Sequence, residues 1–207
     1  MSEFIASIIR QAGDLPVVEI VALVLGIAYL LLAIRESIWC WLCAFISSMI
    51  FAFLFAGARI YMDAGLQLFY AAMAIYGAWS WQFAGGKSSS LPVTRWSEKR
   101  HALAMVAVVT ASALTGLALS TWTDAAFPYI DSFTTYASLW ATFLVARKIL
   151  ENWWYWLVID AISIAIYLER GLSFAALLFA VYLALIPFGL IAWTRSFRET
   201  SAEQSLA

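Results

Sequence analysis

Long uncharged stretches recur along the chain and set its basic pattern. They occupy residues 20–34, 37–58, 64–86, 102–123, 132–146, 152–168 and 171–194, and Asp160 is the only charged residue inside them. A helix needs about 20 residues to cross a bilayer core, whereas the strands of a membrane barrel alternate in hydrophobicity over about ten. Because these stretches are continuously apolar, the sequence predicts an all-α polytopic membrane protein with seven transmembrane helices.

The composition supports a membrane protein and excludes other classes. Hydrophobic residues make up 64% of the 207-residue chain and charged residues 12%, whereas a soluble domain is about half apolar and about a quarter charged. With 12 basic and 13 acidic residues, the chain has no surplus of positive charge for binding nucleic acid. The run Phe4–Ile9 is too short to span a bilayer, so we interpret residues 1–15 as an interfacial segment and not as a signal peptide.

Basic residues are distributed unevenly between the two sides of the predicted helices. If the helices alternate in direction, Arg10, Arg59 and Arg170 fall on one side. The other side holds Arg35, Lys87, Arg95, Lys99, Arg100, Arg147, Lys148, Arg195 and Arg198. The positive-inside rule then places the C-terminus in the cytoplasm and the N-terminus outside. The segment 85–101, rich in Gly, Ser and Pro, is predicted as a flexible cytoplasmic loop, and residues 196–207 as a cytoplasmic tail.

The predicted helices indicate an internal repeat. Residues 16–84 and 128–195 each hold three helices, and residues 102–123 form a connecting helix that lets both units insert in the same direction. Two tryptophan-rich segments match when the following residues are paired: Trp39 with Trp154, Trp41 with Trp156, Phe45 with Asp160, Ser48 with Ser163, Gly65 with Gly171 and Tyr76 with Tyr182. Tryptophans at helix starts also occur for interfacial reasons. A parallel 3+1+3 repeat is typical of transporters with a substrate site between the repeats.

Asp160 is the strongest candidate for a functional residue. A carboxylate near the bilayer centre costs about 2.5–3.5 kcal/mol, so it must contact protein, water or a ligand. Trp153, Trp156 and Asp160 lie on one helix face, and two indoles beside a carboxylate suit a flat cation. The alternatives are a hydrogen bond from Asp160 to a neighbouring helix and a place for the tryptophans in an interfacial belt.

Other polar residues in the predicted helices are few. Gln67 and Tyr70 share a helix face and line either the cavity or a helix interface, and Asn152 either caps its helix or binds a ligand. The repeat adds Trp41 and Phe45 as candidate substrate-binding residues. The pair Cys40 and Cys43 has no second pair for a metal site, and there is no phosphate-binding loop. We therefore predict no metal, no cofactor and no enzymatic activity.

The motif W-x-x-W-x-x-x-N/D, here Trp153, Trp156 and Asp160, resembles the Pnu family of bacterial vitamin transporters. Residues 65–79 and 126–133 resemble the same family, and the resemblance extends over about residues 20–195. It implies a fold like that of SWEET transporters in the bacterial inner membrane. It also implies a homotrimer and facilitated diffusion of a small vitamin, which a cytoplasmic kinase then traps by phosphorylation.

The chain departs from this family at the charged position. Nicotinamide riboside members carry Asn at the position that matches Asp160, and often at the one that matches Phe45. A carboxylate only accepts hydrogen bonds, so it suits an aminopyrimidine or a cation. Thiamine offers both, and we therefore predict thiamine as the substrate, with nicotinamide riboside as the alternative and another nucleoside or a flavin as further possibilities. Three rival interpretations are a proton-coupled symporter that uses Asp160, a binding subunit of a larger transporter and a membrane enzyme.

Overall fold

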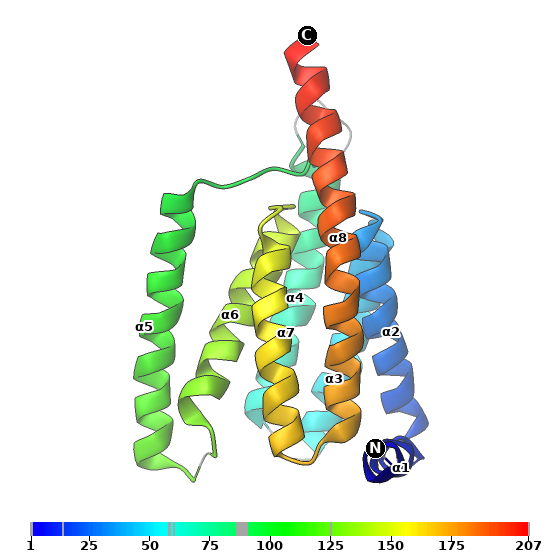
Figure 1. Ribbon diagram of the computed structural model, residues 1–207, viewed down its shortest axis with the longest axis vertical. Helices are drawn as coiled ribbons and strands as arrows, with labels where there is room; N and C mark the ends of the chain where they lie inside the picture. Colours follow the sequence, from blue (N-terminus) through cyan, green and yellow to red (C-terminus); the bar gives the residue numbers. More distant parts are fainter. Residues whose placement is uncertain are drawn as a thin grey trace.

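The computed structural model describes residues 2–206 except 14, 58, 60, 86–90 and 125, so Lys87 and part of the predicted cytoplasmic loop lie outside the described residues. The described residues form eight α-helices, which confirms the all-α class (Figure 1). The helices are α1 (Ser2–Gly13), α2 (Val17–Ile34), α3 (Trp39–Gly57), α4 (Tyr61–Phe83), α5 (Glu98–Trp122), α6 (Pro128–Ala146), α7 (Asn152–Glu169) and α8 (Ser173–Leu206).

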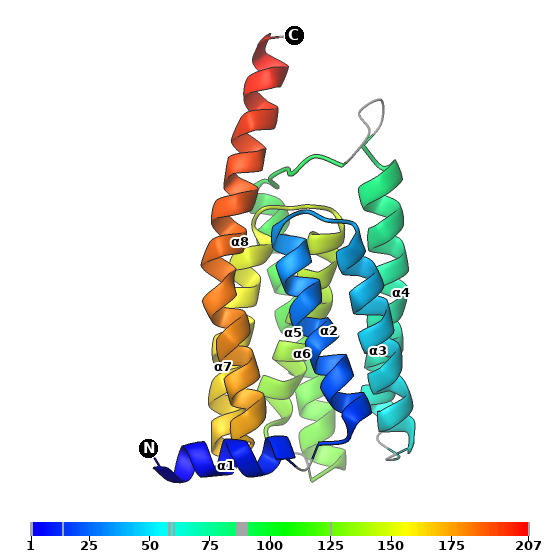
Figure 2. The ribbon, with the colours of Figure 1, turned by 90° about the vertical axis from the view of Figure 1, so that its right-hand side faces the viewer.

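Six of the helices form a closed ring. Helices α2, α3 and α4 pack in sequence order, and so do α6, α7 and α8. The ring closes because α4 also packs on α6 and α2 on α8. Helix α5 lies outside the ring against α6, and α1 crosses one end of the bundle and packs on α8 (Figures 1 and 2). The two three-helix units therefore meet along two seams.

The helices differ in how apolar they are. Within the described residues, α2, α3, α5 and α8 are long and apolar enough to span a membrane by length and composition. Helix α6 is more polar, but several of its hydroxyls bond within the helix: Ser132 donates to Pro128 O (2.7 Å) and Thr142 to Ser138 O (2.8 Å). Such bonds to the preceding turn allow serine and threonine to lie in an apolar bundle.

Two segments differ from the prediction. Residues 91–97 of the predicted flexible loop are held against the turn between α6 and α7: Thr94 N donates to Lys148 O (3.0 Å), Leu150 N donates to Thr94 O (2.9 Å), and Arg95 pairs with Glu151 (2.7 Å). At the other end of the chain, α8 continues as one helix through the predicted tail to Leu206. The first difference arises from contacts between residues 56 positions apart, such as Arg95 and Glu151, which composition does not reveal.

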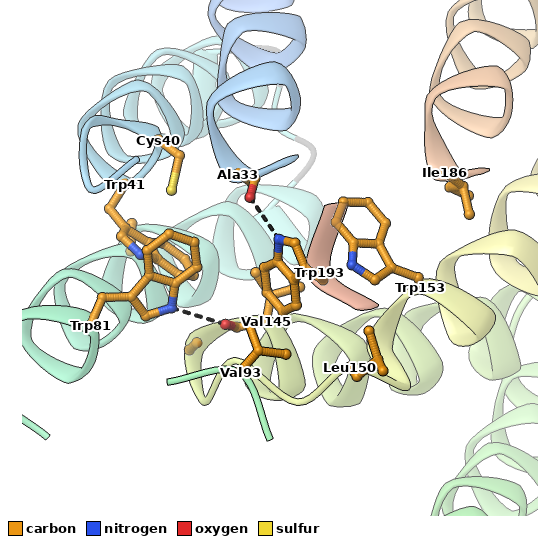
Figure 3. Packing of buried hydrophobic residues seen from close by; sticks show 12 residues of the cluster. Ala33, Cys40, Trp41, Trp81, Val93, Val145, Leu150, Trp153, Ile186 and Trp193 are labelled. Atoms are coloured by element: carbon orange, nitrogen blue, oxygen red, sulfur yellow. Dashed lines mark hydrogen bonds between the residues drawn. The ribbon is translucent and has the colours of Figure 1, made fainter. Parts of the chain in front are cut away.

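Four buried tryptophans join the two units at the end near the α2–α3 and α6–α7 turns (Figure 3). Trp41 meets Trp81 edge-on with ring centroids 5.4 Å apart, and Trp153 meets Trp193 edge-on at 5.5 Å. The N–H of Trp81 donates to the carbonyl of Val145, at 3.0 Å, across the seam. In return, Trp193 donates to the carbonyl of Ala33 at 3.0 Å. Each unit thus gives the other one indole hydrogen bond.

These contacts fix the register of the repeat. Equivalent residues of the two units lie 112 positions apart: Trp41 corresponds to Trp153, Trp81 to Trp193, and Ala33 to Val145. The ion pair between Glu36 and Lys148 joins two residues with the same spacing. Backbone angles repeat in the same register: φ is positive at Glu36 (53°) and Lys148 (49°), and again at Arg59 (62°) and Gly171 (71°).

The repeat pairing drawn from the sequence is therefore wrong by three residues at the tryptophans. The structure pairs Trp41 with Trp153, not with Trp156, and pairs Asp160 with Ser48, not with Phe45. Gly171 corresponds to Arg59 rather than Gly65, and Tyr182 to Tyr70 rather than Tyr76. A shift of three residues is close to one helical turn, so tryptophans at neighbouring turns match in either register.

Replacing Gly77 by Ala is expected to destabilise the protein. A Cβ atom at Gly77 would overlap the indole ring of Trp41, as one at Gly189 would overlap Trp153. Overpacking of this kind costs about 1–3 kcal/mol, which lowers the melting temperature of the detergent-purified protein. Gly65→Ala in the same helix is the matched control, because open space surrounds that position. Equal melting temperatures for the two variants would contradict the packing described.

Candidate functional site

A cavity of about 800 Å³ occupies the centre of the ring and is lined by all six ring helices. At one end it reaches Trp41 and Trp153, whose side chains belong to the buried tryptophan cluster. At the other end it reaches Asp131 and Arg170, which form an ion pair of 2.7 Å and are about one-third exposed. The cavity is thus bounded by packed indoles at one end and has a charged, accessible rim at the other.

Asp160 lies on the cavity wall and is 3% exposed. Among the described residues, no hydrogen-bond donor or basic side chain contacts its carboxylate. Tyr182 of α8 lines the same cavity but makes no hydrogen bond to Asp160. The predicted alternative, a structural hydrogen bond from Asp160 to a neighbouring helix, is therefore not what the described residues form. A buried carboxylate without a partner is costly, so its place on a cavity wall marks a site for a donor or a cation.

The tryptophans of the motif share the same cavity wall. Trp153, Trp156, Asp160 and Ser163 all line the cavity from α7, as their spacing predicts. Trp153 is 2% exposed, and its indole N–H has no hydrogen-bond partner in the part of the chain described. Trp156 is half-buried and presents more of its ring to the cavity. Their role in binding stays a prediction.

The other predicted residues divide between two cavities. Asn152, Gln67, Tyr70 and Trp41 line the central cavity. Phe45 lines a second cavity of about 790 Å³, together with Glu36 and Lys148. Trp41 borders both cavities, whereas Phe45 lines only the second. Phe45 is therefore not among the residues that line the central cavity with Asp160. The sequence placed it there because the two repeats were paired in the wrong register.

Asn152 does not cap its helix. Glu151 occupies the cap position, and Asn152 is the first helical residue. The side-chain amide of Asn152 donates to Ile149 O (2.7 Å), while its Oδ1 is fully buried and unpaired among the described residues. The indole N–H groups of Trp41 and Trp153 are likewise fully buried and unpaired among the described residues, so this end of the cavity has one acceptor and two donors without partners.

Sequence reasoning missed several cavity residues. Tyr29 from α2, Tyr182 from α8 and Ser48 from α3 all line the cavity. Tyr29 lies in an apolar stretch without a distinguishing pattern, so no signal could have found it. Ser48 and Tyr182 could have been found, because the correct repeat register makes them the counterparts of the predicted residues Asp160 and Tyr70.

Comparison with known families gives one match over most of the chain. The sequence model described as "Nicotinamide mononucleotide transporter" matches residues 16–195. The riboflavin/roseoflavin transporter RibM of Streptomyces davaonensis is 26% identical over 188 residues, covering 88% of this chain and 87% of that protein. The nicotinamide riboside transporter PnuC of Escherichia coli is also 26% identical, covering 90% of this chain and 88% of its own.

A solved structure has the same fold. The crystal structure of the vitamin B3 transporter PnuC superposes with a TM-score of 0.70 and covers 95% of this chain and 90% of its own, at 20% identity. At this identity the likeness establishes the fold alone.

Replacing Asp160 by Asn is expected to raise the thermal stability of the ligand-free protein. The change keeps the size of the side chain and replaces an ionisable group by a neutral amide, so the protein no longer has to desolvate an unpaired carboxylate or bind a proton to neutralise it. Asp131→Asn breaks a partly exposed ion pair worth about 0–1 kcal/mol, so it should leave stability unchanged or slightly lower. Melting temperatures in detergent test both; a loss of stability in Asp160→Asn would mean that the carboxylate has a structural partner.

Proposed function

Because the chain belongs to the nicotinamide mononucleotide transporter family, whose sequence model matches residues 16–195, we propose that its central cavity carries a vitamin across a membrane. This membership confirms the resemblance to the Pnu family drawn from the tryptophan motif, and the relatives are transporters, not enzymes. The observation that carries the proposal is the buried, unpartnered carboxylate of Asp160 on the wall of an aromatic cavity.

The proposed substrate is nicotinamide riboside. Thiamine, the substrate predicted first, is not supported, because the relatives are named for nicotinamide riboside and riboflavin. The pyridinium ring of nicotinamide riboside supplies the positive charge that Asp160 lacks, and its flat ring suits the indole of Trp156. Its carboxamide donates to the free Oδ1 of Asn152, and its ribose hydroxyls suit the hydroxyls of Tyr29 and Ser48.

Riboflavin is the second candidate. The relative RibM is named for it, and a cavity of about 800 Å³ has room for a tricyclic ring. The imide N–H of the flavin donates to the carboxylate of Asp160, and its hydroxylated chain suits the same tyrosine and serine groups. The two candidates differ in charge: only nicotinamide riboside neutralises Asp160.

The proposed membrane arrangement follows the two units of the ring. Helices α2–α8 span the bacterial inner membrane in a 3+1+3 arrangement, in which residues 16–84 and 128–195 are the repeats and α5 is the connector. The N-terminal segment lies at the outer surface and the C-terminus in the cytoplasm, in keeping with the positive-inside rule. The Asp131–Arg170 rim then faces outward. A homotrimer and trapping by a cytoplasmic kinase stay as predictions from the resemblance.

Substrate crosses when the two units rock about the cavity, and no covalent chemistry is involved. In the present conformation the tryptophan cluster closes the cytoplasmic end, through the hydrogen bonds from Trp81 to Val145 and from Trp193 to Ala33. Opening to the cytoplasm requires these two bonds to break while the rim closes. The mechanism is therefore alternating access around Asp160.

Nicotinamide riboside is expected to bind the detergent-purified protein, and Asp160→Asn to weaken binding about 30-fold or more, because loss of one partner of a buried charge pair costs about 2–5 kcal/mol. Calorimetry measures both, with Glu169→Gln, an exposed carboxylate at the end of the same helix, as the matched control. Binding of riboflavin alone would transfer the proposal to the second candidate. Uptake by the purified protein in liposomes distinguishes a transporter from a binding subunit.

A further inference from the structure

The charges that line the central cavity are not balanced. Among the described residues, the charged side chains on its wall are Asp131, Arg170 and Asp160. The first two neutralise each other at the rim, with 2.7 Å between Arg170 Nη2 and Asp131 Oδ2. Asp160 lies deeper and is 3% exposed, so the cavity carries one uncompensated negative charge.

The side chains that share the cavity with Asp160 supply no positive charge. Apart from the rim pair, the polar side chains from the neighbouring helices α6 and α8 and from α2, α3 and α4 across the cavity are neutral. They are the amide of Gln67 and the hydroxyl groups of Thr134, Thr135, Ser138, Thr142, Tyr182, Tyr29, Ser47, Ser48 and Tyr70. Two basic groups near the start of α7, Lys148 in the preceding turn and His101 in α5, have partners elsewhere. Lys148 pairs with Glu36 at 2.7 Å, and the His101 ring lies 3.0 Å from the hydroxyl of Tyr155 and 3.6 Å from Glu151.

A lone carboxylate in such a cavity has two ways to become neutral. It pairs with a cation, or it takes up a proton, because an isolated charge in an apolar interior is far more costly than a neutral acid. One carboxylate accommodates one positive charge at a time. A bound cation and a bound proton therefore exclude each other at Asp160.

We propose that the protein exchanges one cationic substrate molecule for one proton at Asp160. This inference rests on the proposed function and goes beyond facilitated diffusion. At the outer side the cation displaces the proton from Asp160, and the proton is released to the outside. The loaded, neutral site opens inward and releases the cation, and Asp160 then takes a proton from the cytoplasm. The neutral empty site returns outward, so each cycle moves one positive charge in each direction.

The exchange differs from the two other modes of coupling in what drives it. Uniport of a cation moves net charge, so a negative-inside membrane potential drives accumulation. Symport with a proton requires a second site, since the substrate already occupies the carboxylate, and an outside-acid gradient drives it. Exchange moves no net charge, so an inside-acid pH gradient drives accumulation and the membrane potential does not.

The test uses the purified full-length protein in liposomes with labelled nicotinamide riboside outside. With the potential clamped to zero by potassium and valinomycin, an interior one pH unit more acidic than the medium should drive accumulation towards a ceiling of about tenfold. A negative-inside potential without a pH gradient should leave the internal concentration no higher than the external one. Asp160→Asn should lose the pH-driven accumulation, and Glu169→Gln should retain it.

Four results would overturn the exchange. They are accumulation that follows the potential, accumulation under an outside-acid gradient, no accumulation under any gradient, and pH-driven accumulation that persists in Asp160→Asn. Absence of any uptake by the unaltered protein under all gradients would overturn the proposed substrate as well, which separates failure of the function from failure of the coupling.

Discussion

Two indole hydrogen bonds hold the ring together at one end, and the rest of the structure depends on them. Trp81 donates to a carbonyl at the end of α6, and Trp193 donates to the equivalent carbonyl at the end of α2. Because each bond runs from one unit to the other, they fix the relative position of two units that share few other polar contacts. The rings fit because Gly77 and Gly189 leave room for the neighbouring indoles.

This scaffold is nearly symmetric, but the cavity that it encloses is not. Trp41 and Trp153 bound the cavity in equivalent positions. By contrast, the repeat counterpart of Asp160 is Ser48, and the repeat counterpart of Asn152 is Cys40. The packing that closes the bundle is thus duplicated, while the unpaired carboxylate that can recognise a charge belongs to the second unit alone; the first unit contributes the amide of Gln67. A ligand with one cationic face and one polar face would bind such a cavity in a single orientation.

The sequence predicts the helices and the main polar residue of the site, because both depend on strong local signals. Continuous apolar runs locate α2–α8, and a lone carboxylate among tryptophans marks Asp160 and Trp156. The wrong placement of Phe45 has a specific cause, since helices that begin with several tryptophans can be matched one turn out of register. Tyr29 could not have been found, because an aromatic residue in an apolar helix looks alike whether it faces lipid or a cavity, whereas Tyr182 follows from Tyr70 once the register is correct.

The central claim is that the cavity around Asp160 is the substrate site. A crystal or cryo-electron microscopy structure of the protein with nicotinamide riboside tests it most directly. The account predicts the pyridinium ring in the central cavity, against Trp156 and beside the carboxylate of Asp160. Ligand density in the second cavity beside Phe45, or in the central cavity with Asp160 still unpartnered, would contradict it.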